Sequence, residues 1–378
     1  MKRIYRKLFD FFYPYLKGGQ LYFVNNKKKI SLYIPNNNNY LSDDKICKRI
    51  FESFKRMKKD EKRNSDVSVS SQWQKHIDKD FYPLKQSLKQ NDFIIFKNFI
   101  QNFGNWNKYL GIEEQTFIQK CNKNFILRKY LTDHVFLNQL KLWNYFNADR
   151  KKISCLQTPK FGNQIGAILE KKYFTTLASF SNEIIASNLN DLIKNTNRPV
   201  IAELGGGYGQ LAYFLLNKKR SCFIDIDIPE TLCLAAYYLI KCFPKKKVFL
   251  YGEKSLPENF TKQYDLIFLP SYLHKKLKRN SIDLFINKNS LGEMYPNTIN
   301  AYFKSINKSA KYFFHMNHHI YRNQFNGVKK GLLSEEYPIS KDFKLVSKYP
   351  DFLHLIWIDG KLRLENDIFC YLYVKKNF

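Results

Sequence analysis

The chain has 378 residues, of which 44% are hydrophobic and 17% aromatic, enough for two folded domains and too apolar for a disordered chain. The net charge of +30 comes mainly from lysine spread along the sequence beside frequent Asn, Ile, Phe and Tyr, residues with A/T-rich codons, so it does not by itself indicate a nucleic-acid ligand. Seven widely spaced cysteines without a C-x-x-C pair argue against a disulfide framework or zinc site, and no apolar run approaches the roughly 20 residues of a membrane span.

Residues 1–160 are predicted to form a mainly helical N-terminal domain that covers the substrate or mediates oligomerisation. Apolar residues recur every three or four positions in residues 93–103 and 125–146. The charge run at 55–63 predicts a solvated helix face or a loop. No secretory signal is evident, so we expect a cytoplasmic protein. The basic, aromatic segment 5–22 fits either an ordinary terminal helix or a peripheral contact with an anionic membrane at its inner face.

Residues 161–378 have the pattern of an α/β domain. A turn at 161–163 precedes a helical pattern over 165–193. Short apolar runs then alternate with helical spacing, which predicts a Rossmann-like, seven-stranded sheet with helices on both faces. The predicted strands are residues 200–204, 221–226, 247–251, 264–269, 311–316, 353–358 and 368–374, with a turn at 359–360 between the last two.

A cluster of glycines follows the first of these strands. A nucleoside must approach the backbone closely where such a strand turns into a helix, and side chains there would block it. A dinucleotide fingerprint would need a third glycine where Gln210 stands, and no P-loop lysine follows. The acidic Glu203 at the strand tip suits a cationic sulfonium and ammonium group better than a pyrophosphate. The predicted cofactor loop comprises Gly205, Gly206, Gly207 and Gly209.

A second carboxylate ends the second strand. Asp227 lies 24 residues after Glu203, where a carboxylate can accept both ribose hydroxyls of a nucleoside. Asp225 points to the same side of a regular strand, but Asp227 is preferred because the strand ends there and Pro229 begins a helix. Ile228 is assigned to the same cofactor site. The alternative is a structural strand, turn and helix without a ligand.

These motifs resemble the class I S-adenosylmethionine-dependent methyltransferases and, more narrowly, a bacterial family of sugar O-methyltransferases. The resemblance covers about residues 155–325 and is most specific in the N-x-x-S-x-G-E-M segment. It implies methylation of a sugar hydroxyl in surface polysaccharide or glycolipid synthesis. It further implies that Glu203, Gly205, Gly207 and Asp227 bind the methyl donor, and that Asn289, Glu293 and Asn317 line the substrate side. The segments that carry it are residues 161–163, 203–210 (ELGGGYGQ), 224–232 (IDIDIPETL), 264–270 (YDLIFLP), 287–294 (NKNSLGEM) and Asn317.

Methyl transfer to oxygen needs alignment of the reacting atoms and removal of a proton. The candidate catalytic residues are Glu293, His274 and His318, placed after the fourth and fifth predicted strands. His274 could instead be a solvated residue that begins a basic run, and Glu293 a local cap. At most one of His318 and His319 can face a pocket from an extended segment, and His315 is expected in the core. No metal site is predicted.

Two other functions remain open. A nucleic-acid methyltransferase is favoured by charge, but residues 269–272 lack the double proline with which base-amino methylases clamp a flipped base. A non-catalytic methyltransferase-like module would have no need of an intact glycine loop and Asp227. The expected acceptor is a sugar, a nucleotide sugar or a lipid-linked glycan, and the sequence does not determine the oligomeric state.

Overall fold

The computed structural model describes residues 30–35, 43–61, 66–106, 135–147, 151–325, 329–351 and 367–378. The predictions for residues 5–22, 353–358 and 359–360 lie outside these ranges. Among the helices within them, none is long and apolar enough to cross a bilayer.

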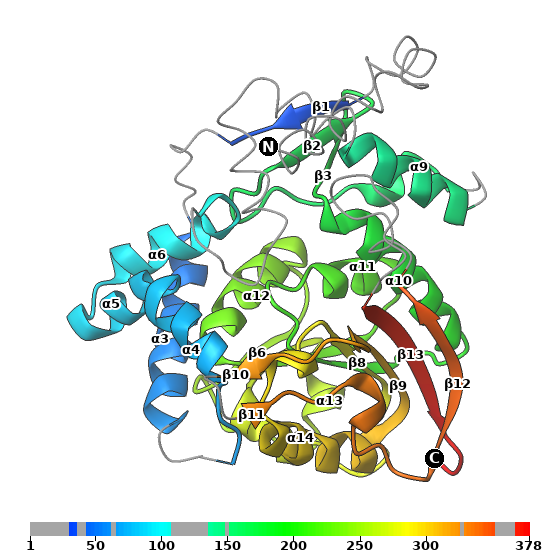
Figure 1. Ribbon diagram of the computed structural model, residues 1–378. Helices are drawn as coiled ribbons and strands as arrows, with labels where there is room; N and C mark the ends of the chain where they lie inside the picture. Colours follow the sequence, from blue (N-terminus) through cyan, green and yellow to red (C-terminus); the bar gives the residue numbers. More distant parts are fainter. Residues whose placement is uncertain are drawn as a thin grey trace, which may run out of the picture.

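A large, mostly parallel sheet forms the centre of the molecule and confirms the predicted Rossmann-like α/β fold (Figure 1). Its strand order is β12-β13-β9-β8-β4-β5-β7-β6, so the described residues contain eight strands of this sheet instead of the predicted seven. The six strands from β9 to β6 are parallel. At one edge, β13 pairs antiparallel with β9, and β12 pairs antiparallel with β13. The strands are β4 (Val200–Leu204), β5 (Cys222–Asp227), β6 (Val248–Leu250), β7 (Leu266–Pro270), β8 (Ile282–Lys288), β9 (Ala310–His318), β12 (Phe343–Pro350) and β13 (Ile368–Lys375).

The sequence analysis missed the strand that pairs with β4 on the side away from β5. The strand predicted at 264–269 is observed as β7, but it pairs with β5 on the far side of Asp227. The neighbour of β4 is β8, which was not predicted, and β12 was also missed. The segment that follows β8 is therefore the one that lies beside the end of the glycine-loop strand.

Helices cover both faces of the sheet. One face packs against α10 (Ala178–Leu192), α11 (Gln210–Lys218) and α12 (Pro229–Cys242), while the other packs against α13 (Phe260–Gln263) and α14 (Pro296–Ser309). Successive strand residues such as Ile201 and Ala202 belong to the two different cores, as the alternation of side chains along a strand requires. The short helices η4 (Ser271–Lys276) and η5 (Leu291–Glu293) follow β7 and β8.

The N-terminal helices extend the core of the first face. The described elements confirm a mainly helical region: α3 (Asp44–Glu61), α4 (Ser71–Lys79), α5 (Tyr82–Gln90), α6 (Phe93–Gln101), η1 (Phe103–Asn105) and α9 (Leu137–Phe146). Buried residues of α3 and α6 join those of α11 and α12 in one cluster. The Tyr237 hydroxyl donates to Asp43 Oδ2 (2.9 Å) and the Tyr272 hydroxyl to the Met57 carbonyl (3.1 Å), so these helices are fixed to the sheet domain.

The long helix predicted over residues 165–193 is wrong up to residue 177, nearly half of its length. Residues 166–175 form a hairpin of β2 (Gly166–Leu169) and β3 (Tyr173–Thr175), and α10 begins only at Ala178. The strand β1 (Ile30–Tyr33) pairs with β2 and completes a small sheet. The turn uses Glu170 and Lys171 at φ of 50° and 60°, a left-handed conformation that usually selects Gly or Asn. The other short elements are η3 (Ile153–Leu156), β10 (Gln324–Phe325), β11 (Lys329–Lys330) and η6 (Ser334–Glu336).

Candidate active site

The glycine loop at the end of β4 has the backbone conformation that its sequence predicts. Gly205, Gly207 and Gly209 have φ of +73°, +61° and +85°, which side chains disfavour. A Cβ on Gly205 would lie 2.2 Å from Ser290 Oγ, whereas a Cβ on Gly207 would have no described atom within 4 Å. The loop is therefore packed tightly at Gly205 and faces open space at Gly207.

These two glycines offer a matched pair of substitutions. We expect Gly205→Ala to destabilise the fold by several kcal/mol, because backbone strain of about 1–3 kcal/mol is added to a clash with Ser290. Gly207→Ala should lower the free energy of unfolding only by the backbone strain. It should nevertheless weaken ligand binding, because its methyl group projects into the open space. Urea unfolding and titration with S-adenosylhomocysteine measure the two effects. Equal losses of stability in both variants would contradict this assignment.

Two buried carboxyl groups lie beneath the loop. Glu203 on β4 is in register with Asp225 on β5, and their side chains are 2% and 0% exposed. A Cβ on Gly206 would lie 2.9 Å from Asp225 Oδ1 and 3.2 Å from Glu203 Oε2. Among the described residues, neither oxygen of Asp225 nor Glu203 Oε2 has a hydrogen-bond partner. Burial raises the pKa of Glu203 to about 7 and that of Asp225 well above its usual range.

Asp227 ties the end of β5 to the glycine loop. Its Oδ2 accepts from the Gly207 amide (3.2 Å) and its Oδ1 from the Ile228 amide (2.7 Å). Burial raises the pKa of Asp227 to about 6, against hydrogen bonds from Thr231, Ile228 and Gly207 that favour the ionised form. Glu203, Gly207, Asp227 and Ile228 therefore lie together at the carboxyl end of two adjacent strands, as the sequence predicts.

The turn after β8 is bonded directly to the end of β4. Asn287 donates from Nδ2 to the Leu204 carbonyl (2.8 Å), and Ser290 Oγ donates to the same carbonyl (3.2 Å). Asn317, at the end of β9, donates to Asn287 Oδ1 (2.8 Å) and accepts from the Gly292 amide (3.3 Å). The fully buried Asn317 thus holds this turn in place through Asn287, the first residue of the N-x-x-S-x-G-E-M segment, to which the sequence analysis assigned no role of its own.

Glu293 ends the short helix of this turn, and the His318 ring lies against it. Glu293 Oε2 accepts from Trp73 Nε1 at 2.6 Å, so α4 lies against it. The His318 ring lies within 2.9 Å of the position of a Cβ on Gly292. Its Nδ1 is hydrogen-bonded to Asp367, a second residue that the sequence did not indicate. Asn289 is exposed, with a φ of +57°, and its amide donates to the Met316 carbonyl at 2.7 Å.

His274 is held against a different element. The alternative of a solvated residue is wrong, because His274 is 2% exposed and its Nδ1 lies 2.8 Å from Ser305 Oγ on α14. Burial lowers the pKa of His274, although the nearby Asp66 opposes this. His315 is fully buried and stacks on Tyr371 with ring centroids 4.7 Å apart, which confirms its expected place in the core.

A polar network beside Glu203 was missed by the sequence analysis. Lys288 Nζ donates to Asn182 Oδ1 (2.8 Å), Asn182 Nδ2 donates to Gln210 Oε1 (2.9 Å), and Gln210 Nε2 donates to Thr176 Oγ1 (2.6 Å). The charge of Lys288 acts against burial on the pKa of Glu203. The network therefore joins the one cation that acts on Glu203 to two side-chain amides and a hydroxyl.

Comparisons with known proteins give distant likenesses. No family model matches the chain and no curated protein matches it. The mitomycin 7-O-methyltransferase MmcR aligns at 10% identity and a TM-score of 0.33, over 53% of this chain and 55% of MmcR. The glycopeptide N-methyltransferase MtfA, solved with sinefungin, aligns at 11% identity and a TM-score of 0.31, over 51% of this chain and 86% of MtfA.

A third structure, the PH0226 protein from Pyrococcus horikoshii OT3, aligns at 13% identity and a TM-score of 0.34, over 52% of this chain and 92% of PH0226. With MmcR the alignment thus spans little more than half of each chain. These likenesses are too distant to carry an argument about activity, which has to come from the site itself.

Proposed function

We propose that this protein is an S-adenosylmethionine-dependent methyltransferase that methylates a sugar hydroxyl in surface polysaccharide or glycolipid synthesis. The observation that supports it most is the buried pair of Glu203 and Asp225 beneath a glycine loop that is open at Gly207: within the described part of the chain, Glu203 Oε2 and both Asp225 oxygens accept no hydrogen bond. Burying carboxyl groups without partners is costly, and a cationic ligand above them would offset that cost.

The residues present fit the methyl donor. Asp227 at the strand end would accept from the ribose hydroxyls, Gly207 would leave room for the nucleoside, and Glu203 would supply the carboxylate for the cationic part. When bound, the donor supplies a methyl group on a positively charged sulfur. The chain's own part is to orient the acceptor hydroxyl in line with that bond and to take its proton.

The acceptor side is assigned to the turn that carries Glu293. The resemblance to sugar O-methyltransferases is most specific in this turn, and the hydrogen bonds of Asn287 and Ser290 to Leu204 keep it next to the donor loop. Glu293 belongs to this turn and the His318 ring lies against its Gly292, and we assign both side chains to the orientation of hydroxyl groups. Carboxylates, imidazoles and amides are suitable partners for a polyhydroxylated ligand because each can accept from or donate to a hydroxyl.

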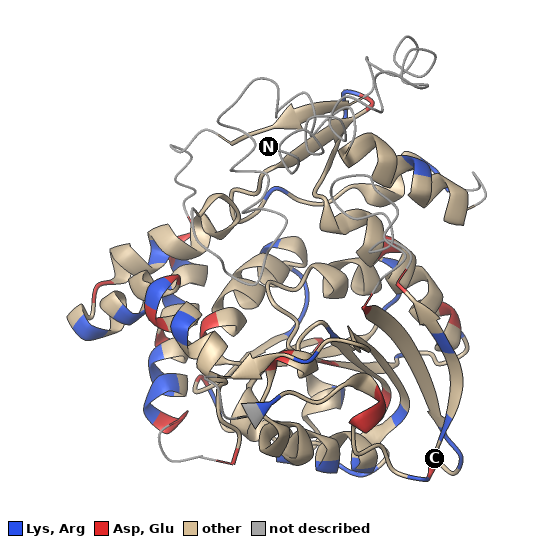
Figure 2. Ribbon diagram, in the orientation of Figure 1, with Lys and Arg blue, Asp and Glu red and all other residues tan. Residues whose placement is uncertain are grey.

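A nucleic-acid methyltransferase is the second candidate because of the net charge of +30. Basic side chains are spread over several described elements, including α3, α5, α14 and the end of β12, instead of forming one stripe (Figure 2). A nucleic-acid groove would concentrate them along one track, so the sugar assignment is preferred.

The proposal is tested in two steps with purified protein. Calorimetric titration with S-adenosylhomocysteine should show micromolar binding. Transfer of a labelled methyl group is then measured with nucleotide sugars, free hexoses, a lipid-linked glycan, transfer RNA and duplex DNA as acceptors. We expect label in a sugar. Label in nucleic acid alone would replace the sugar assignment by the second candidate, and a folded protein that binds no S-adenosylhomocysteine would overturn the methyltransferase assignment.

A further inference from the structure

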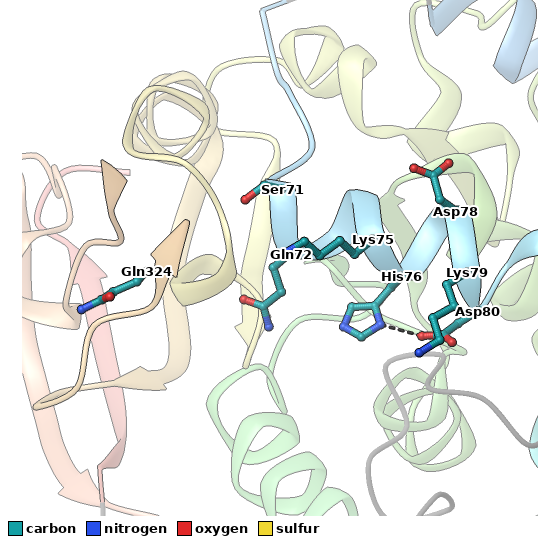
Figure 3. Close-up of a pocket in the computed structure, with 8 residues that line it drawn as sticks. All are labelled: Ser71, Gln72, Lys75, His76, Asp78, Lys79, Asp80 and Gln324. Carbon is teal, nitrogen blue, oxygen red and sulfur yellow. Dashed lines mark hydrogen bonds and ion pairs between the residues drawn. The ribbon is translucent and has the colours of Figure 1, made fainter. Parts of the chain in front are cut away.

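Two pockets among the described residues differ in the balance of their charges. The first has a volume of about 640 Å³, lies between α4 and β10, and is shown in Figure 3. Its two lysines, Lys75 and Lys79, are balanced by Asp78 and Asp80. The second, of about 580 Å³, lies between α14 and η4 and is lined by three lysines and a single carboxylate, that of Asp66. The second pocket therefore has an excess of positive charge.

One side of α14 forms the floor of this second pocket. Its lining residues follow one another at spacings of one, three or four positions, which places them on a single helix face. Ala301 stands in the middle of this row and has the smallest side chain. The opposite side of the helix is buried in the core beneath the sheet. The residues of the exposed row that matter below are Asn297, Asn300, Ala301, Lys304 and Lys308.

The wall across from this row is fixed by hydrogen bonds. His274 Nδ1 lies 2.8 Å from Ser305 Oγ on α14, and His274 Nε2 lies 3.4 Å from Asp66 Oδ2. The same carboxylate pairs with Lys275 Nζ at 2.6 Å. Both ring nitrogens of the buried His274 are thus used within the wall, and burial lowers its pKa, so the ring is neutral at pH 7. Lys275 offsets the charge of Asp66.

The remaining two lysines carry the excess charge. Lys304 is exposed, and within the described ranges its ammonium group has no ion-pair or hydrogen-bond partner. Lys308 Nζ donates to the Lys275 carbonyl at 3.3 Å, which uses one of the three protons of its ammonium group. The exposed Asn297 and Asn300 place two side-chain amides in the same row. The floor therefore presents two cations and two amides to whatever occupies the pocket.

We propose that this pocket binds the phosphate group of a soluble organic ester or of a lipid headgroup. A phosphate monoester has a charge of about −1.5 to −2 at pH 7 and three acceptor oxygens, which suit two ammonium groups and two amides. The volume is within the range of small-ligand sites and leaves space for the organic part of an ester. The lining includes no residue of the glycine loop or of the turn with Glu293, so this site does not depend on the proposed methyl transfer.

The test is calorimetric titration of the full chain with glucose 1-phosphate. We expect saturable binding at one site per chain with a Kd of about 1 mM or tighter. Lys304→Gln should raise this Kd about tenfold, because it removes a hydrogen bond between charged groups. Ala301→Leu should also raise it, because the larger side chain fills the pocket while every charge is kept. The matched control is Lys262→Gln, which removes an exposed lysine of α13 outside the pocket and should leave the Kd unchanged.

Cosedimentation with phosphatidylcholine vesicles that contain phosphatidic acid distinguishes the two sources of phosphate. Binding of glucose 1-phosphate supports a soluble ester, and sedimentation that requires phosphatidic acid and Lys304 supports a lipid headgroup. A folded parent that binds neither would overturn the proposal. An equal loss of binding in Lys262→Gln would show attraction to the overall net charge, and unchanged binding in Ala301→Leu would place the phosphate outside the pocket. Displacement by S-adenosylhomocysteine would place it at the glycine loop. Each of these three results contradicts the assignment.

Discussion

Replacing Asp227 with alanine is expected to raise the dissociation constant for S-adenosylhomocysteine about 100-fold or more. The carboxylate is assigned two ribose hydroxyls, and hydrogen bonds to a charged acceptor contribute about 1.5–3 kcal/mol each. The substitution also removes the acceptor of the Gly207 and Ile228 amides, which hold the loop in place. Calorimetric titration of the parent and the variant under identical conditions measures the change.

Asp283 provides the control for this substitution. It lies in β8, and its Oδ2 accepts from the Val200 amide at 2.8 Å, at the opposite end of β4 from the glycine loop. Asp283→Ala removes a comparable bond between a carboxylate and a backbone amide without touching the site. Its Kd should equal that of the parent. A similar loss of affinity in both variants would mean that sheet stability, and not ribose binding, explains the effect of Asp227→Ala.

The cofactor side of the site could be predicted from the sequence because its signals are local. The glycines, Glu203 and Asp227 occupy two consecutive strand ends, and parallel pairing of β4 with β5 places those ends together. The positive φ angles at Gly205, Gly207 and Gly209 are the conformational reason for glycine at these positions. Pro229 begins α12 as expected, because its fixed φ suits the first turn of a helix.

The order of the strands could not be read in the same way. Both β7 and β8 are apolar runs followed by polar residues, and either could lie beside β4 by pattern alone. The choice depends on packing between helices that are distant in the sequence. The hairpin at residues 166–175 was missed for a different reason. Its turn places Glu170 and Lys171 at positive φ, so the usual Gly or Asn signal is absent, and its partner β1 lies more than 130 residues earlier.

The acceptor side depends on contacts across the whole chain. Nothing in the sequence of α4 shows that its Trp73 reaches Glu293, 220 residues away. The same holds for His318 and Asp367. These pairs form only when the N-terminal helices and the last strands pack around the carboxyl edge of the sheet.

Glu203→Gln is expected to stabilise the unliganded protein at alkaline pH. Burial raises the pKa of Glu203 from 4.5 to about 7, so the folded state holds a proton that the unfolded state has lost. The stabilisation from this proton is complete below pH 4.5 and disappears as the pH rises to about 7. At about 1.4 kcal/mol per pKa unit, the parent loses roughly 3 kcal/mol more than the glutamine variant over this window, because Asp225 and Asp227 titrate in both proteins. Urea unfolding at pH 5 and pH 8 measures the difference.

The opposite change in stability is expected when Glu183, a second buried glutamate, is replaced by glutamine. Burial alone would raise the pKa of Glu183, but Lys218, Trp143 and Lys151 together hold it below its ordinary value. Glu183→Gln should therefore destabilise the protein at pH 8, whereas Glu203→Gln should stabilise it. If both substitutions destabilise at pH 8, then Glu203 is already paired within the fold.

Glu203→Gln, which should stabilise the unliganded protein, is expected to weaken its binding of the methyl donor. A cationic donor favours the ionised carboxylate, so affinity for S-adenosylmethionine should increase as the pH rises from 5 to about 7, with release of a proton on binding. The glutamine variant should bind more weakly at pH 8 and lose the part of this pH dependence that lies above the pKa of Asp227, about 6. If the glutamine variant is more stable but binds the donor more weakly, then the buried charge of Glu203 lowers stability and is retained because it binds the ligand.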